Sequence, residues 1–228
     1  MKKRLMFLIQ FGVVIIFLGG CSTQFIYKHP VAKPPESPGI VLAYKMIEDQ
    51  RADQTIDKIY ESKQPIQDIA KVIEEEIKST GLFAKVLLIP EDLVNSETFL
   101  KENNVALLTT PILKDFKWLV PNYDIKIGVI APVVFCCGVI GGVIYGFFPT
   151  DVSGDTVLKI SVTDLKSTDL LIDKEYVGHF AEREILFNCD TPTTKATVAG
   201  KSLEAAMAEF KADLVAAVKS RNSKKPAH

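Results

Sequence analysis

The sequence has few of the residues that build metal and redox centres. Its 228 residues include only four cysteines and three histidines. No two cysteines have the Cys-x-x-Cys spacing of zinc and redox sites, and no pair of histidines lies near them. If one cysteine is modified, the remaining three cannot make a full disulfide framework. The sequence therefore predicts neither a structural metal nor a bound cofactor.

The common catalytic motifs are also missing. There is no glycine-rich phosphate loop after a strand, no Gly-x-Ser-x-Gly turn and no His-Glu-x-x-His helix. His179 ends an expected strand, where a surface position is the simplest interpretation, and the acidic run 74–76 is expected to be a solvated helix face. We therefore expect a protein that is not an enzyme.

The charge balance is close to neutral, with a formal net charge of -1. Without Lys2, Lys3 and Arg4, the only charged residues of the first twenty, the chain has 24 basic against 28 acidic residues. A mildly acidic body lacks the broad basic surface that nucleic acids need, so no nucleic-acid partner is expected. The basic residues near the C-terminus are interpreted as a disordered tail over residues 221–228.

The N-terminal segment is typical of a secretory signal peptide. A basic start is followed by an apolar run over residues 5–18, which only Gln10 interrupts, and then by small residues. The run is shorter than the ~20 residues that a spanning helix needs. Residues 1–20 are therefore predicted to be a signal peptide, although an uncleaved signal anchor is the alternative.

The residues Leu18, Gly19, Gly20 and Cys21 resemble the lipobox of bacterial lipoproteins. This resemblance implies that the Cys21 thiol receives a diacylglycerol, that the chain is cut between Gly20 and Cys21, and that the new amine is acylated. Two or more acyl chains anchor a protein stably to a membrane. The same resemblance implies the outer membrane, facing the periplasm, if the source has two membranes, because Ser22 stands where lipoproteins kept at the inner membrane commonly have an aspartate.

The segment after the lipobox is rich in proline, which stiffens a chain towards an extended path. Residues 21–38 are therefore predicted to be a lipidated cysteine followed by a tether that lifts the folded domain off the membrane. The prolines are Pro30, Pro34, Pro35 and Pro38.

The folded part begins near residue 39, and its clearest element is a helix over residues 65–80. Pro65 suits the first helical position, and Gly81 suits the end. Isoleucines recur at helical spacing in between, which predicts one buried face. They are Ile66, Ile69, Ile73 and Ile77.

The remaining patterns predict a sheet with packed helices. Strands are expected over residues 39–44, 83–89, 105–108, 158–162 and 170–180, with a weak strand at 56–60, a bend or edge at Pro111, and helices over 90–102 and 200–220. We therefore predict one α/β or α+β domain over residues 39–220, with a mixed sheet of five to six strands and about three helices. This order of elements, with its closing helix, resembles the small periplasmic domains of lipoproteins such as the ABC-transporter auxiliary proteins and the curli secretion channel lipoprotein.

Residues 127–149 form an insert without a charged residue, and three interpretations compete. The insert is a transmembrane helix, a hairpin that dips into the membrane and turns at Gly141-Gly142, or an apolar core or subunit interface. A single crossing would divide what looks like one sheet, which favours the hairpin. The residues expected to contact the membrane or another protein are Gly138, Gly141, Gly142, Gly146, Phe147 and Phe148.

Together these features predict a lipid-anchored protein of the bacterial cell envelope. Its expected partners are membrane lipid, through acylated Cys21, and another envelope protein or further copies of itself. A non-catalytic binding or assembly role is the leading hypothesis. The alternative is an oligomeric accessory subunit of a secretion channel or transporter that assembles through residues 127–149.

Overall fold

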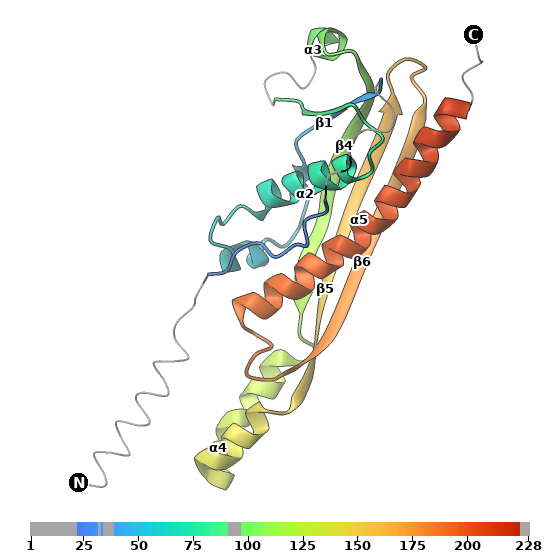
Figure 1. Cartoon of the computed structure of the whole chain (residues 1–228). Helices are drawn as coiled ribbons and strands as arrows, with labels where there is room; N and C mark the ends of the chain where they lie inside the picture. The colour runs from blue at the N-terminus through green and yellow to red at the C-terminus, as the bar shows by residue number, and fades with distance from the viewer. Residues whose placement is uncertain (1–21, 32, 34–38, 91–96, 224–228) are drawn as a thin grey trace.

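The computed structural model describes residues 22–31, 33, 39–90 and 97–223, so the predicted signal peptide and Cys21 lie outside the described residues. The described chain forms a six-stranded mixed sheet with five helices, which confirms the predicted α/β class (Figure 1). The strands are β1 (Val41–Tyr44), β2 (Glu48–Asp49), β3 (Lys85–Leu88), β4 (Val105–Leu119), β5 (Pro149–Asp164) and β6 (Leu170–Ile185). The helices are η1 (Thr55–Ile59), α2 (Pro65–Ser79), α3 (Glu97–Glu102), α4 (Tyr123–Gly146) and α5 (Pro192–Ser223).

The sheet has the order β3-β1-β4-β5-β6, and β2 pairs with β4 beyond the end of β1. β1 runs parallel to β3 and β4, whereas β4, β5 and β6 form a long antiparallel ribbon. The register joins Leu107 to Asp164 and Leu119 to Ser153. β4, which precedes α4, and β5, which follows it, are therefore neighbours in one sheet. The chain enters and leaves α4 at the same end of this sheet.

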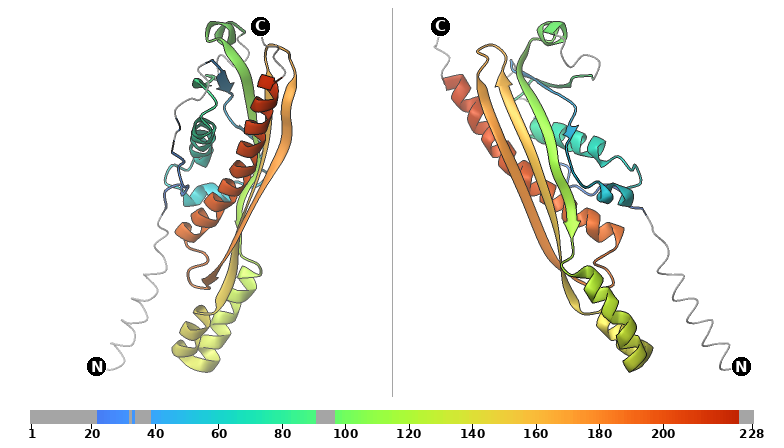
Figure 2. Two further views of the ribbon diagram at one scale, coloured as in Figure 1. Left: turned by 45° about the vertical axis from the view of Figure 1, so that its right-hand side comes forward. Right: turned by 180° about the vertical axis from the view of Figure 1, so that it is seen from behind.

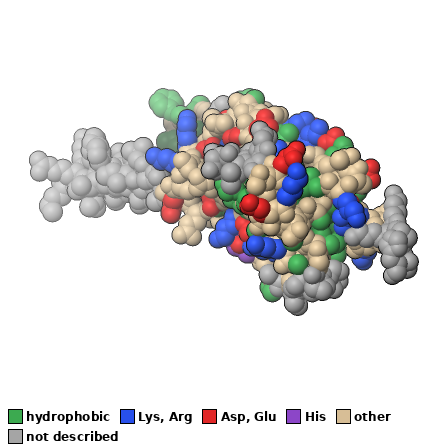
Figure 3. All heavy atoms as spheres, turned by 90° about the horizontal axis from the view of Figure 1, so that it is seen from above, with side chains coloured by type: hydrophobic (Ala, Val, Ile, Leu, Met, Phe, Trp, Pro, Cys, Tyr) green, Lys and Arg blue, Asp and Glu red, His purple; other side chains and the backbone are tan. Residues whose placement is uncertain are grey.

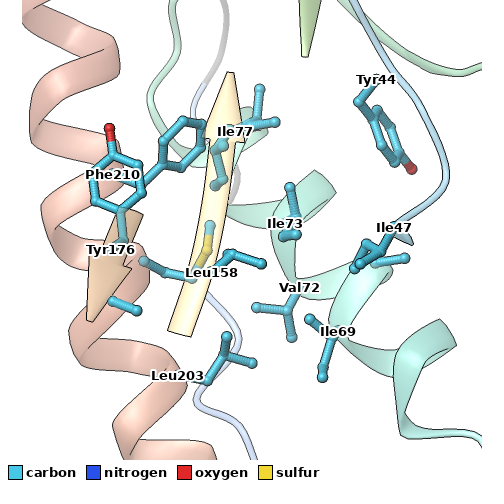
Figure 4. Packing of buried hydrophobic residues seen from close by; sticks show 14 of the residues in the cluster. Tyr44, Ile47, Ile69, Val72, Ile73, Ile77, Leu158, Tyr176, Leu203 and Phe210 are labelled. Atoms are coloured by element: carbon cyan, nitrogen blue, oxygen red, sulfur yellow. The ribbon is translucent and has the colours of Figure 1, made fainter. Parts of the chain in front are cut away.

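One face of the sheet is covered by α2 and α5, and the main core lies between them and the strands. Ile69, Ile73 and Ile77 of α2 are fully buried, as the helical spacing predicts. Figure 4 shows the α2 side chains lying towards Leu158 of β5, with Phe210 of α5 in the same cluster. The helical periodicity of this segment thus positions α2 on the sheet.

The approach of α5 to the sheet depends on two glycines. A Cβ atom at Gly154 of β5 would meet the carbonyl of Val198, and one at Gly178 of β6 would meet the carbonyl of Ser202. Next to them, the buried hydroxyls of Thr156 and Ser202 lie 2.7 Å apart and share a hydrogen bond. The absence of side chains at these glycines allows the α5 backbone to pack directly on the strands.

Over most of its length the opposite face of the long ribbon carries no helix in the part of the chain described here (Figure 2), and α3 packs only at the end away from α4, in a cluster with Leu108 of β4. This face is covered by paired charges, such as Lys159 with Asp173 at 3.2 Å and His179 with Asp155 at 2.7 Å. The His179 side chain is 61% exposed, in agreement with its predicted surface position. Alternation of apolar and polar residues along β5 thus separates a core face from a wet face.

Two local features differ from the expected elements. The strand expected over residues 105–108 is longer, because β4 continues through Pro111 to Leu119. Pro111 is at an edge only on one side of β4, where it lies between the residues that pair with β1 and those that pair with β2 and needs no N–H group. The weak strand at 56–60 is instead the 3-10 helix η1, since the Asp53 carboxylate accepts a hydrogen bond from the backbone N–H of Thr55 at 2.8 Å and favours a turn.

The predicted tail also differs from the structure. α5 begins at Pro192 rather than near residue 200 and continues to Ser223. The Arg221 side chain is only 8% exposed, and its guanidinium pairs with the Asp164 carboxylate, whose side chain is also 8% exposed. Residues 221–223 therefore belong to the folded body, and residues 224–228 of the predicted tail lie outside the described residues.

The described part of the predicted tether packs on the body instead of extending away from it. Thr23 donates its N–H to the carbonyl of Ile59 at 2.8 Å, and the Phe25 ring stacks on Phe116. The buried Tyr27 hydroxyl donates to the Glu76 carboxylate at 2.6 Å. Proline content identifies a stiff segment, but these aromatic contacts hold its first part against the domain.

This contact also corrects the interpretation of the acidic run on α2. Glu76 is buried, and its carboxylate accepts hydrogen bonds from Tyr27 and from Lys211 Nζ at 2.7 Å. Burial and the hydrogen bond to Glu76 raise the pKa of Tyr27 far above its usual range, so its hydroxyl stays protonated as the donor. The remaining glutamates bond Tyr44 and His29 rather than only water.

We expect Tyr27→Phe to lower the free energy of unfolding by about 1 kcal/mol, because one hydrogen bond is lost while Lys211 still neutralises Glu76. Urea unfolding measures the change. Amide hydrogen exchange should also become faster at residues 22–29 and remain unchanged in β5. Equal protection of residues 22–29 in both proteins would contradict this account of the docked segment.

Candidate functional site

The most unusual feature of the described chain is α4, which lies at one end of the elongated body (Figure 1). It is two helical arms joined at Gly138, whose φ of 72° and ψ of 179° interrupt the helix. A φ in this range suits glycine, which lacks the Cβ that would clash there. The chain therefore reverses direction, and α4 is a hairpin rather than one continuous helix. Among the described residues, no helix is both long and apolar enough to cross a bilayer.

The two arms pack on each other through a small residue. A Cβ at Gly142 on the second arm would meet the side chain of Val134 on the first arm. Gly142 is buried, although it is expected from sequence at a contact surface. The turn is at Gly138 and not at Gly141-Gly142, because Gly142 is needed for the contact between the arms.

The base of the hairpin is fixed to the body. The backbone N–H of Phe187 donates to the carbonyl of Gly146 at 3.1 Å, and that of Leu186 donates to the carbonyl of Phe148 at 3.0 Å. The Phe187 ring occupies the space beside Gly146, so this glycine too is buried within the chain. A small apolar cluster continues these contacts into the body; its buried members are Val120, Val152, Leu186, Cys189 and Val198.

Beyond its base the hairpin is exposed and apolar. Phe135 is 92% exposed and Ile140 is 76% exposed, and both lie close to the turn at Gly138. From residue 127 to residue 149 there is no charged side chain. Such a patch is rare on a protein that contacts only water and marks a contact surface. The other large exposed apolar residues of the hairpin and its base are Ile125, Ile127, Val129, Val134, Val139, Val143, Ile144, Phe147 and Phe148.

The residues expected at the contact surface thus divide into two groups. Gly138, Phe147 and Phe148 are exposed and Gly141 is partly exposed, so they belong to the surface of the hairpin. Gly142 and Gly146 are buried within the chain and do not. The most exposed side chains, Phe135 and Ile140, were missing from the prediction, although the absence of charge around them is the signal that identifies the insert.

A groove of about 660 Å³ lies far from the hairpin, between α3, the start of β4 and the end of α5. Its lining combines apolar residues, among them Leu100, Val105 and Leu165, with the charged residues Glu97, Lys101, Lys166 and Arg221. Figure 3, which views this end, shows acidic and basic side chains interspersed over the surface. Within the described residues no cluster of three or more His, Cys, Asp or Glu side chains could hold a metal.

No known family model matches the chain, and no curated protein matches it. Among solved structures, a neuraminyllactose-binding hemagglutinin homologue from Helicobacter pylori has 10% identity and a TM-score of 0.52, and the match covers 88% of this chain and 100% of that one. This likeness extends over nearly the whole chain and shows a shared fold.

Two other similar structures are more distant. A PelC dodecamer from Paraburkholderia phytofirmans has 8% identity and a TM-score of 0.34 over 78% of this chain and 94% of that one. A lipoprotein from Neisseria meningitidis has 10% identity and a TM-score of 0.25 over 82% of this chain and 99% of that one. Structures with a low similarity to this chain thus include one bacterial lipoprotein and one dodecamer.

Proposed function

We propose that this chain is an envelope lipoprotein that is acylated on Cys21 and that binds or assembles with other envelope proteins without catalysing a reaction. The lipobox-like residues 18–21 support the anchor, and Ser22 supports an outer-membrane location facing the periplasm. The observation that carries the proposal is the exposed part of the α4 hairpin, which has no charged residue after Lys126, on an otherwise polar body. An apolar hairpin, in addition to a lipid on Cys21, suits a protein that works at a membrane surface.

The docked segment 22–29 supports this arrangement. It packs beside η1 and against Gly200 of α5, in the half of the body nearer to α4 (Figures 1 and 2). A lipid on Cys21, one residue before Ser22, would therefore hold that half close to the membrane. The groove beside α3 would face the opposite way, where a partner protein can reach it.

We expect Cys21→Ala to abolish acylation and to leave the signal peptide uncleaved. Metabolic labelling with an alkyne analogue of palmitate should mark the natural protein and not the variant, since acyl transfer needs the thiol. Sucrose-gradient separation of membranes should place the natural protein with the outer membrane. Cys136→Ala is the matched control, because it removes an exposed thiol outside the lipobox. Equal labelling of the natural protein and the Cys21 variant would exclude the proposed anchor.

The second candidate is an accessory subunit of a secretion channel or transporter that oligomerises through residues 127–149. The exposure of Phe135 and Ile140 favours it, because such side chains suit a subunit interface as well as lipid. Bulky residues at Gly142 would disturb the arms themselves and cannot test it. Sedimentation in mild detergent should instead show a defined multimer that Phe135→Asp dissociates, and a monomer in both proteins would argue against this candidate.

A further inference from the structure

We propose that the α4 hairpin inserts into a single leaflet of the membrane that carries the Cys21 lipid, with its tip among the acyl chains. The inference rests on the function proposed above. It names what the α4 hairpin contacts, in addition to the lipid anchor on Cys21. The tip consists of the residues around the turn, namely Phe135, Cys136, Gly138, Val139 and Ile140.

The distribution of apolar side chains around the hairpin favours lipid over a protein partner. Neighbouring residues of a helix point about 100° apart. Val139, Ile140, Val143 and Ile144 are all exposed and form an apolar stripe about 140° wide on the second arm, and the rest of this arm carries no charged residue either. A helix on a protein surface normally keeps one polar side for water. A partner protein that binds one side of the hairpin would leave its other apolar sides exposed to water. Acyl chains would surround the hairpin and cover all of them.

The backbone of the hairpin also suits lipid. Hydrocarbon offers no hydrogen-bond partners, so a segment within it must pair its own polar groups. Both arms are helical and satisfy this condition except at their ends and at Pro132, which lacks the N–H group that would bond the carbonyl of Gly128. The close contact of Gly142 with Val134 lets the arms enter as one compact unit.

The length of the arms fits one leaflet. At about 1.5 Å per residue, residues 139–146 span about 12 Å and residues 127–137 about 16 Å. Half of a hydrocarbon core of about 30 Å is about 15 Å. The hairpin therefore reaches the middle of the bilayer and turns back, which keeps both strands that leave it on the same side.

The base of the hairpin has the residues that a membrane interface favours. The Tyr145 and Phe148 rings lie 5.6 Å apart, and the Phe147 and Phe187 rings lie 6.0 Å apart. Aromatic side chains gather at the headgroup level of membrane proteins. Charges begin at this level and have both signs, as in the exposed pair of Arg183 with Asp151 at 3.5 Å. Mixed signs give no preference for anionic lipid, so insertion should depend little on salt.

The test uses the native thiol of Cys136, which is exposed at the tip, while Cys189 is buried. The full-length acylated protein carrying Cys137→Ser is labelled with an environment-sensitive dye and reconstituted in phosphatidylcholine vesicles. Two quenchers are compared: aqueous iodide, and lipids with a nitroxide near the methyl end of the acyl chain. The matched control carries the dye at Leu170→Cys, with Cys136→Ser added, at the far end of β6, where Leu170 is 57% exposed.

We expect the nitroxide lipid to quench the dye at the tip. We also expect this dye to be about tenfold less sensitive to iodide than the control dye, because an aqueous ion does not enter the layer of acyl chains. The same result is expected at high salt and with phosphatidylglycerol added. Phe135→Asp with Ile140→Asp should return iodide sensitivity to the control value, since charge is costly in hydrocarbon.

Other outcomes separate the two proposals. Iodide sensitivity of the tip dye on vesicle-bound protein would overturn insertion and leave the lipoprotein assignment intact. Protection from both quenchers would overturn it in favour of an interface between protein chains. Protein that does not bind vesicles and whose Cys21 carries no lipid would overturn the proposed function itself.

Discussion

Gly178→Val is expected to lower the free energy of unfolding by about 3 kcal/mol, the upper end of the usual cost of overpacking a core. The carbonyl of Ser202 on α5 occupies the space that a side chain at position 178 would need. This obstacle is helix backbone and cannot rotate away, so α5 must shift on the sheet. The shift would also separate the buried hydroxyls of Thr156 and Ser202. Urea unfolding followed by circular dichroism measures the loss.

Gly39→Val is the matched control, because a Cβ there meets nothing within 4 Å. Valine is favoured in strands, so strand preference alone would make the Gly178 variant more stable rather than less stable. A Gly178 variant that is as stable as the Gly39 variant would show that α5 does not pack on β6 as described.

Asp164→Asn is expected to cost about 2 to 3 kcal/mol at neutral pH, because it leaves the buried Arg221 guanidinium without its carboxylate. This pair joins the end of β5 to the last turn of α5. Asp169→Asn is the matched control, since Asp169 is exposed in the same turn. Similar losses in both variants would mean that the ion pair does not hold α5.

The same pair predicts how stability depends on pH. The hydrogen bond from Arg221 holds the pKa of Asp164 below its usual range. A carboxyl whose pKa is lower in the folded state stabilises the protein above its unfolded pKa, and this contribution is lost as the pH falls through the folded pKa. The difference in stability between the natural protein and Asp164→Asn should therefore be full at pH 7 and shrink in acid. A difference that does not change with pH would contradict the assignment.

The spacing of apolar residues along the sequence predicted which face of a helix or strand is buried. The spacing of Ile69, Ile73 and Ile77 identified the buried face of α2, and the strands expected over residues 158–162 and 170–180 form parts of β5 and β6. Both depend on which side of an element meets the core, and periodicity encodes that side. The extent of β4 through Pro111 was missed, because it depends on where β1 and β2 pair with it.

Long-range contacts account for the other misses. Tyr27 donates a hydrogen bond to Glu76, 49 residues further along the chain, and Arg221 donates one to Asp164, 57 residues before it. Such partners leave no periodic trace in the sequence, so a docked segment was interpreted as a tether and a buried arginine as part of a tail. The absence of charge identified the insert correctly, but the turn at Gly138 depends on the packing of Val134 against Gly142, which spacing alone does not reveal.

The central claim is that lipid on Cys21 holds this body at a membrane, and intact mass spectrometry of the membrane-extracted protein tests it most directly. The account predicts a chain that begins at Cys21 and carries the added mass of a diacylglycerol and an N-linked acyl chain. In Cys21→Ala it predicts the full chain from residue 1 without that mass. A natural protein that retains Met1 and carries no lipid would contradict the account.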